Sequence, residues 1–190
     1  MSELGRGRRC PRCRHRRHDY QWLVAGGAYE GAVRQMVLRL KYGPDPRAAR
    51  TLARLMAPRL AEALTRRPPR ALIPVPLHPA RRRLRGFNQA ELLARELAPR
   101  LGLPVWHGLL ARAVATVAQA GLAGSVRRAN VAQAFAAASA WRCRRLRGAR
   151  VALVDDVVST GSTLDACARV LRGLGAREVG AVVIATSLDG

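Results

Sequence analysis

The chain has 190 residues, of which 49% are hydrophobic, and it carries a formal net charge of +22 at pH 7. This apolar content excludes a wholly disordered chain, and no stretch approaches the ~20 consecutive apolar residues that a membrane-spanning helix needs. The length suits one α/β domain with a small N-terminal appendage, and no membrane insertion is expected.

Residues 1–28 are expected to form a basic lead that precedes a folded domain of residues 29–190. The lead carries arginines followed by Cys10 and Cys13, and it lacks the apolar segment of a secretory signal peptide. Cysteines in a chain without a secretory signal indicate a reducing compartment, so a cytoplasmic location is predicted.

Apolar residues at regular spacing predict the first elements of the domain. Residues 33–40 place them at i, i+3, i+4 and i+7 and are followed by a Gly-Pro pair, which ends a helix. A second helix is predicted over residues 52–64. Residues 71–77 predict a buried strand whose two prolines lead it into a loop. Another helix is predicted over residues 90–101, and a short strand is expected within residues 104–110.

The C-terminal half of the chain predicts a parallel crossover unit. Residues 111–148 are weakly periodic and are expected to form loop plus helix, with Cys143 as a surface thiol. Residues 151–154 predict a buried strand, residues 164–174 a helix and residues 179–185 a further strand. A strand–loop–helix–strand order of this kind favours two parallel strands joined by the helix.

Two adjacent acids, Asp155 and Asp156, follow the first of these strands. Ligands bind at the carboxyl ends of strands in open α/β sheets, so we expect these carboxylates to face a ligand. The next seven residues are uncharged, and Gly161 permits a turn that points successive N–H groups at one oxyanion, beside the positive end of a helix dipole. The sequence therefore predicts phosphate binding by Val157, Val158, Ser159, Thr160, Gly161, Ser162 and Thr163.

Other phosphate-binding loops do not fit this run of residues. A Walker A loop needs Gly-Lys-Ser/Thr and a dinucleotide fingerprint needs GxGxxG, and neither is present here. Carboxylates beside a phosphate suit a ligand that also offers sugar hydroxyls, a Mg²⁺ ion or both. The alternative is a plain strand–turn–helix junction with Ser/Thr capping, although two adjacent acids repel each other without a cation or polyol.

The run VALVDDVVSTGST, residues 151–163, resembles the phosphoribosyl pyrophosphate motif of type I phosphoribosyltransferases. Residues 29–42, residues 73–94 and residues 112–135 resemble segments of the ComF family, which includes the GntX-like proteins. The resemblance implies an α/β, type I phosphoribosyltransferase-like fold, a parallel sheet flanked by helices. It also implies that the two acids bind the ribose hydroxyls and Mg²⁺ and that the loop after them binds the 5′-phosphate.

Further anion-binding candidates come from the segments that resemble this family. The prolines of residues 74–79 suit a stiff loop whose N–H groups are expected to face pyrophosphate, and nearby arginines are expected to neutralise its charge through bidentate contacts. Lys41 is the only lysine in the chain, which suits a site that needs a compact ammonium; a helix C-terminal cation is the alternative. The predicted pyrophosphate-binding residues are Lys41, Pro76, Leu77, His78, Arg81 and Arg85, and the loop candidates are Arg112, Gln119, Arg128 and Asn130.

The N-terminal lead departs from the family pattern. ComF-like proteins usually begin with a zinc ribbon that carries two CxxC pairs, whereas this chain has one, Cys10 and Cys13. His15 and His18 follow, but four ligands this close in sequence leave very short loops for a tetrahedral site. The lead is therefore expected to be a truncated remnant of the ribbon, through a late start or genuine loss, and Zn²⁺ binding stays open.

The predicted function is binding of phosphoribosyl pyrophosphate with Mg²⁺, with transfer of the phosphoribosyl group to an unidentified acceptor as a candidate activity. The transfer needs charge stabilisation and positioning rather than a nucleophile, but nothing in the sequence marks a base pocket. The alternatives are a sensor without turnover, and an accessory protein of competence that binds single-stranded DNA alongside DNA-uptake proteins. The charge of +22 agrees with a nucleic-acid partner and equally with a coding bias toward Arg.

Overall fold

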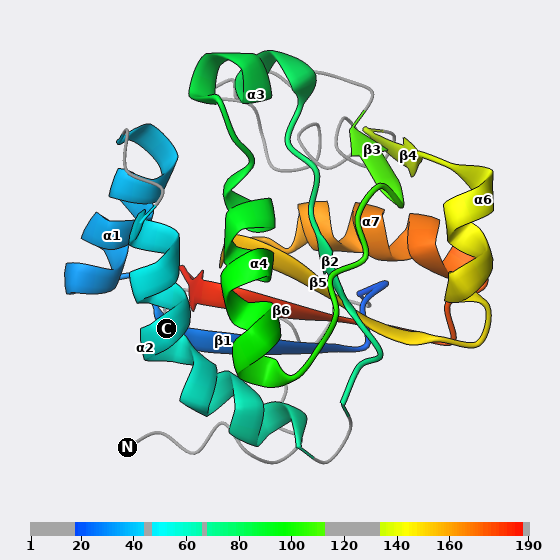
Figure 1. The fold of residues 1–190 in the computed structure, drawn as a ribbon, viewed down its shortest axis with the longest axis horizontal. Coiled ribbons are helices and arrows are strands. Elements are labelled where there is room, and N and C mark those ends of the chain that lie inside the picture. The colour runs from blue at the N-terminus through cyan, green and yellow to red at the C-terminus, as the bar shows by residue number, and fades with distance from the viewer. Residues whose placement is uncertain (1–17, 44–46, 66–67, 113–133, 188–190) are drawn as a thin grey trace.

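The computed structural model describes residues 18–43, 47–65, 68–112 and 134–187. Its centre is a parallel four-stranded sheet in the order β1-β6-β5-β2, as Figure 1 shows. The strands are β1 (Trp22–Ala28), β2 (Leu72–Pro74), β5 (Arg150–Val158) and β6 (Glu178–Thr186). The type I phosphoribosyltransferase-like fold predicted from the sequence is confirmed in its α/β layers and parallel pairing.

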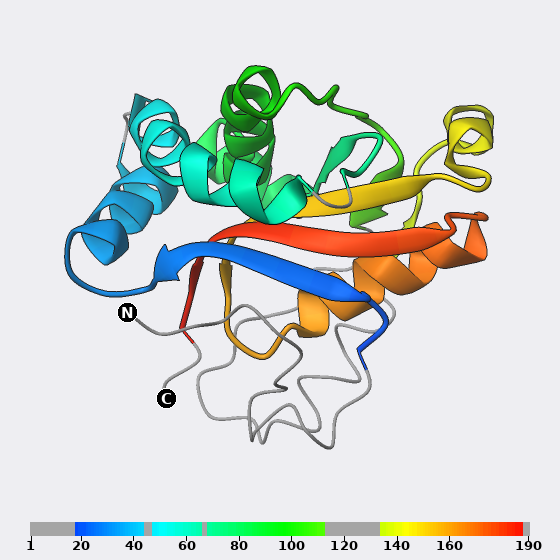
Figure 2. The ribbon, with the colours of Figure 1, turned by 90° about the horizontal axis from the view of Figure 1, so that it is seen from below.

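Helices cover both faces of this sheet (Figure 2). One face packs against α1 (Gly31–Tyr42), α2 (Arg47–Leu64) and α4 (Gln89–Leu101), and the other against α7 (Ser162–Gly173). Smaller elements lie around the edges: α3 (Pro79–Arg85), the antiparallel pair β3 (Leu110–Arg112) and β4 (Phe135–Ala137), α6 (Ala140–Cys143) and the 3₁₀ turn η1 (Arg144–Leu146). No helix among the described residues has the length and apolar character needed to span a membrane.

The apolar run at the start of β5 follows from its position between two helical layers. Val151 and Leu153 pack on the α7 side, whereas Ala152 and Val154 pack on the side of α2 and α4. All four are fully buried. A parallel strand covered on both faces has no polar face to alternate with, which explains why the sequence reads as continuously hydrophobic here.

The structure corrects several expectations about the elements. Residues 22–28, placed in the lead, form edge strand β1 and pair in parallel with β6. Residues 104–110 form no strand before Leu110; instead Val105 makes an isolated bridge to Leu72. Cys143 is not a surface thiol, because it is 5% exposed and packs in the core. The division into a lead and a domain stays a prediction, since residues 1–17 lie outside the described residues.

Candidate functional site

Asp155 and Asp156 lie within β5, whose pairing with β6 continues to Val158. The backbone N–H of Asp156 donates to Asp155 Oδ1 over 2.9 Å, and that of Val157 donates to Asp156 Oδ1 over 2.7 Å. Beyond the acids the faces of the strand shift, because Val157 packs on the side of α2 and α4 and Val158 on the side of α7. The acid pair therefore sits at an irregularity near the carboxyl end of a central strand.

The carboxylate of Asp156 is buried and only partly satisfied. Its side chain is 5% exposed, and Oδ1 lies 3.2 Å from the ammonium of Lys41 at the end of α1. Its other oxygen, Oδ2, is buried without a hydrogen-bond partner among the described residues. A buried acceptor without a donor is costly, and such groups cluster at functional sites. The only lysine of the chain is thus placed against one of the two predicted acids.

Asp155 is half-buried, and the positive charge of Lys41 that pairs with Asp156 also favours the ionised form of Asp155. Burial of the carboxyl group and the neighbouring charge of Asp156 raise the pKa of Asp155 to about 7, against the opposing effects of the Asp156 N–H, Lys41 and Arg112. Asp155 therefore exchanges a proton near neutral pH. One ammonium and two backbone N–H groups compensate the pair only in part, and a ligand that supplies further positive charge or hydrogen-bond donors favours the ionised form.

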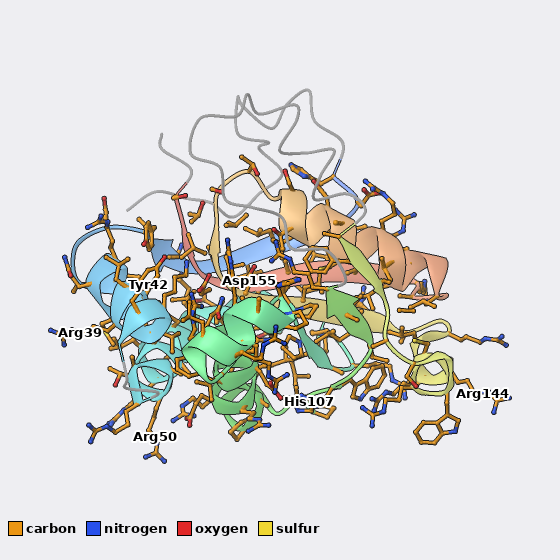
Figure 3. The ribbon with its side chains drawn as sticks, turned by 90° about the horizontal axis from the view of Figure 1, so that it is seen from above. Arg39, Tyr42, Arg50, His107, Arg144 and Asp155 are labelled. Carbon is orange, nitrogen blue, oxygen red and sulfur yellow. The ribbon has the colours of Figure 1, made fainter. Side chains whose placement is uncertain are left out.

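A cavity of about 180 Å³ opens beside the acids. Cations outnumber acids around it, with one lysine and three arginines against two carboxylates. Figure 3 shows Asp155 at the middle of the molecule, with Tyr42 beside it at the end of α1. The cavity is lined by Lys41, Tyr42, Val75, Pro76, Leu77, Arg81, Arg85, Asn88, Gln89, Arg112, Asp155, Asp156 and Thr163.

The predicted anion-binding residues divide into two groups. Lys41, Pro76, Leu77, Arg81 and Arg85 line the cavity with the acids, as does Arg112 from the loop candidates. His78 does not line it; its Nδ1 accepts a hydrogen bond of 3.2 Å from the Ala80 N–H and caps α3. Gln119, Arg128 and Asn130 lie outside the described residues, as do Cys10 and Cys13.

The guanidinium groups at the cavity are held in different ways. Arg85 donates to Gln89 Oε1 over 2.6 Å, and its guanidinium carbon lies 5.6 Å from the centre of the Tyr42 ring. Arg112 lies 5.2 Å from the Phe135 ring, and burial together with the charge of Arg81 lowers its pKa. Arg85 of α3 is thus held by contacts with α4 and α1, whereas Arg112 reaches the site from the β3–β4 pair.

The connection between β5 and α7 is shorter than the run of seven residues for which the sequence predicts phosphate binding. Val157 and Val158 are strand residues, and Val158 is 4% exposed in the core, so the loop between β5 and α7 is residues 159–161, of which Ser159 and Thr160 are exposed. Gly161 adopts φ +74°, a left-handed conformation that suits glycine, and α7 begins at the next residue. A side chain at Gly161 would bring its Cβ to 2.8 Å from the hydroxyl of Tyr20. The glycine is therefore needed for its backbone and for the close approach of the N-terminal segment.

Residues before β1 hold the first turns of α7. His18 Nδ1 lies 3.0 Å from Asp165 Oδ2, and the Asp19 N–H donates to Asp165 Oδ1 over 2.9 Å. Arg169 donates to Asp19 Oδ2 over 2.7 Å, and the His18 ring stacks on Tyr20 with 4.6 Å between centroids. Sequence reasoning missed this contact. The available signal was an acid, Asp165, on the buried stripe of a predicted helix.

Comparison with known proteins agrees with this geometry. The model of the phosphoribosyl transferase domain matches residues 87–190. Competence protein F of Haemophilus influenzae is 36% identical over 90% of this chain and 75% of its own length. DNA utilization protein YhgH of Salmonella typhi is 34% identical over 90% of this chain and 74% of its own length. The chain belongs to the ComF-like family of phosphoribosyltransferase-fold proteins.

Among solved structures, this ComF-like chain is similar to the glutamine phosphoribosylpyrophosphate amidotransferase of B. subtilis. The two are 19% identical with a TM-score of 0.46, over 77% of this chain and 30% of the other. The family assignment rests on the sequence matches, which cover both acids, α7 and β6.

Sequence reasoning also missed four lining residues of the ComF-like site, Tyr42, Val75, Asn88 and Gln89. Asn88 has two roles: its Oδ1 accepts from the Ala90 N–H to cap α4, and its Nδ2 donates to the Val75 carbonyl over 3.0 Å. An Asn directly before an amphipathic helix is a capping signal that the sequence offered. Asn88 thereby ties α4 to the proline loop that lines the cavity.

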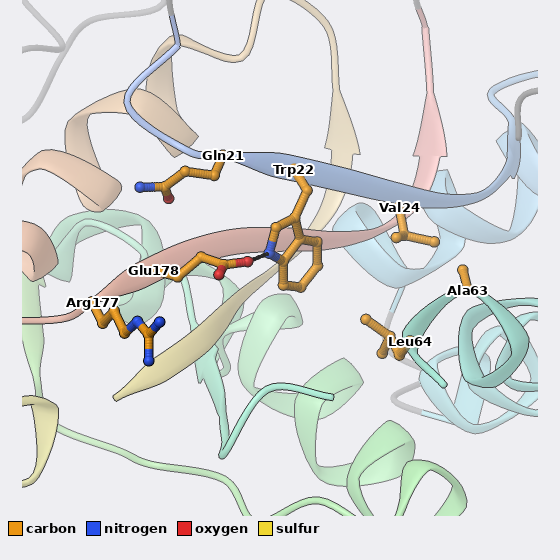
Figure 4. A pocket seen from close by; sticks show the side chains of 7 residues that line it. All are labelled: Gln21, Trp22, Val24, Ala63, Leu64, Arg177 and Glu178. Carbon is orange, nitrogen blue, oxygen red and sulfur yellow. Dashed lines mark hydrogen bonds between the residues drawn. The ribbon is translucent and has the colours of Figure 1, made fainter. Parts of the chain in front are cut away.

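A larger cavity of about 490 Å³ lies at the opposite ends of the strands (Figure 4). Its carboxylate, Glu178, is fully engaged: Oε1 accepts from the Trp22 indole over 2.8 Å, and Oε2 accepts from Arg150 over 2.8 and 3.0 Å. The cavity brings together no acid pair and no phosphate loop. In this ComF-like chain the smaller cavity is therefore the candidate site, and the larger one is lined by Gln21, Trp22, Val24, Ala63, Leu64, Arg177 and Glu178.

Proposed function

We propose that the chain binds phosphoribosyl pyrophosphate together with Mg²⁺ beside Asp155 and Asp156. The observation that carries the proposal is the acid pair: two adjacent carboxylates share one lysine, one oxygen has no described partner, and the pKa of Asp155 is raised to about 7. Ribose hydroxyls donate hydrogen bonds to carboxylates, and Mg²⁺ prefers such hard oxygen ligands, with phosphate oxygens completing its shell. The donor set fits both.

The remaining parts of the cavity suit the two phosphate ends of this ligand. The 5′-phosphate is assigned to residues 159–163, where Gly161 turns the backbone and α7 presents its N-terminus. The pyrophosphate is assigned to Lys41, Arg81, Arg112 and the backbone at Pro76 and Leu77. Bound Mg²⁺ would supply charge neutralisation of the pyrophosphate, held by the acids.

Transfer of the phosphoribosyl group is the candidate reaction at this site. The bond from the anomeric carbon to pyrophosphate would break, and a bond to an acceptor nitrogen would form. Cations around the cavity would stabilise the leaving pyrophosphate. Binding without turnover, as in a sensor, is the alternative. The names of the relatives, competence protein F and DNA utilization protein, support a role in competence or in the use of DNA.

Titration calorimetry with phosphoribosyl pyrophosphate, with and without Mg²⁺, tests the binding. We expect Mg²⁺-dependent binding that exceeds the affinity for ribose 5-phosphate or pyrophosphate alone, because each of these lacks one end of the ligand. Equal affinity for pyrophosphate alone would show that the site is a general anion site, and the proposal would fail. Pyrophosphate release measured with a panel of bases separates a transferase from a sensor.

A further inference from the structure

A cluster of tryptophan and arginine side chains lies far from the acid pair, near the start of β5. Trp141 on α6 is 76% exposed, although a side chain of this size is normally buried. Four exposed arginines follow it within six residues. Figure 3 shows Arg144 of this cluster pointing away from the body of the protein, at the opposite side from Tyr42. The Trp–Arg surface consists of Trp106, Trp141, Arg142, Arg144, Arg145 and Arg147.

The backbone beneath the Trp–Arg surface is anchored in the core. Cys143 is 5% exposed and Leu146 is fully buried, and both belong to the cluster that packs on α7. The Gly148 N–H donates to the Gly175 carbonyl over 2.9 Å. Because Cys143, Leu146 and Ala149, every third residue of this turn, are held inside, the residues between them are fixed on the outside. The surface is therefore a preformed platform rather than a freely moving chain.

Its side chains combine flat rings with cationic groups. The guanidinium of Arg145 lies 4.9 Å from the Trp106 ring and donates to the His107 carbonyl over 3.3 Å. Arg142 lies across Gly108, which has φ +66° and where any side chain would collide with the guanidinium. Trp106 itself is half-buried against the core. Two of the three tryptophans of the chain thus lie among these arginines.

No acidic neighbour among the described residues neutralises the charge of the Trp–Arg surface. No Asp or Glu occurs between Glu96 and Asp155 in the sequence. Within the described ranges, no ion pair involves any of its four arginines, whereas Arg82 and Arg95 pair with Glu91 and Arg150 pairs with Glu178. The nearest acid contact is at its margin, where Glu91 lies 3.5 Å from His107 Nδ1.

We propose that the Trp–Arg surface binds single-stranded nucleic acid, with Trp141 stacking on a base and the arginines contacting phosphates. Aromatic faces and cations along one surface bind single strands without strong sequence preference, because every base offers a flat face. A duplex hides those faces, so stacking on Trp141 favours single strands. The assignment deepens the DNA role under the proposed function, yet it lies at the other end of β5, so either can fail alone.

Fluorescence anisotropy with labelled oligo(dT) over a salt series tests the surface in the full chain. We expect Trp141→Ala to weaken binding about tenfold, as for loss of one stacked base. Replacing Arg144 and Arg147 with Gln should lower the salt slope by roughly 1.4, since each lost phosphate contact removes about 0.7. Trp141→Phe keeps an aromatic face, so it should keep most of the affinity but lose the part of the intrinsic fluorescence quenching that comes from Trp141.

Matched control variants distinguish binding at the Trp–Arg surface from binding by the overall positive charge of the chain. Arg54→Gln with Arg59→Gln removes the same charge from exposed positions on α2, and it should leave the slope unchanged. If this control lowers the slope as much, or if Trp141→Ala binds oligo(dT) like the parent, the proposal is overturned. Equal dependence of duplex binding on Trp141 would also overturn it. Asp155→Asn should keep oligo(dT) binding, which separates this result from the fate of the phosphoribosyl pyrophosphate site.

Discussion

The carboxylates at the two ends of strand β5 differ in how completely they are hydrogen-bonded and charge-paired. At its start, Glu178 of the neighbouring strand accepts hydrogen bonds from Trp22 and, twice, from Arg150. Near its end, Asp156 has one ammonium at 3.2 Å and one oxygen without a described partner, and Asp155 beside it has a pKa raised to about 7. The same sheet thus carries one satisfied acid and one unsatisfied pair.

This difference distinguishes Glu178, whose charge stabilises the fold, from Asp155 and Asp156, whose charges are available to a ligand. An acid with all its hydrogen bonds made contributes to stability, and its removal leaves its partners without an acceptor or an opposite charge. An under-bonded acid costs stability in the empty protein and gains partners when a ligand arrives. The comparison predicts that mutations at the two ends should affect different measurements.

The largest effect is expected from changing both acids at the unsatisfied end. Asp155→Asn with Asp156→Asn should weaken Mg²⁺-dependent binding of phosphoribosyl pyrophosphate by at least about a hundredfold, because hydrogen bonds to charged groups contribute about 1.5–3 kcal/mol each. Asn keeps the Oδ1 acceptors for the N–H groups of Asp156 and Val157, so the fold should persist. Titration calorimetry measures the affinity, and an unchanged value would remove the acids from the site.

Lys41 provides the next largest effect, on stability. Lys41→Met should lower the free energy of unfolding by roughly 2 kcal/mol, less than the ~3–5 kcal/mol for a fully buried pair because Lys41 is 22% exposed. Arg39→Met is the matched control, since Arg39 is an exposed cation in the same last turn of α1. If both variants lose equal stability in urea denaturation, Lys41 acts on the helix dipole and not on Asp156.

Much of this fold was predictable from the sequence because its central strand is buried on both faces. The continuous apolar run of residues 151–154 could only be a covered strand or a helix segment, and the acids and glycine after it favoured the strand. Strand β1 was missed because its sequence, WLVAGGA, carries two glycines and follows a basic segment. Its pairing with β6, in which Trp22 lies opposite Gly180, is a tertiary contact that no local pattern records.

The candidate site was predictable where one segment supplies it and unpredictable where several meet. The acids and Gly161 came from a single run of sequence. His78 lies in the same proline loop as Pro76 and Leu77, but its backbone position makes it a helix cap, which only the observed start of α3 reveals. The contact of Tyr20 with Gly161 joins segments far apart in sequence.

A moderate effect is expected at the satisfied end of β5. Glu178→Gln should lower the free energy of unfolding by about 1–2 kcal/mol, because Arg150 loses a charged partner while the Gln oxygen still accepts from Trp22. Glu96→Gln is the control, since its pair with Arg100 is an i,i+4 contact on a helix surface, worth at most about 0.5 kcal/mol. Affinity for phosphoribosyl pyrophosphate should not change; a loss of affinity would show that the two ends are coupled.

The smallest effect is the dependence of stability on pH at Asp155. Its pKa is about 7 in the folded protein, against an ordinary value of 3.8. Between these values the folded state binds more protons than the unfolded state, so this group makes stability fall as pH rises from about 4 to about 7 and adds no further change above that. Asp155→Asn removes the effect, so the variant should gain on the parent by roughly 2–3 °C in Tm between pH 6.5 and pH 8.

The same group should also give a signal when the ligand binds. A Mg²⁺-bearing ligand favours the ionised carboxylate, so binding at pH 7 should release a fraction of a proton from the parent and none from Asp155→Asn. Calorimetry in buffers of different ionisation enthalpy measures this release. Two results together would contradict this prediction: a Tm difference between the two proteins that stays constant with pH, and equal proton release from both. The raised pKa would then not belong to Asp155, and its carboxylate would be a structural charge like that of Glu178.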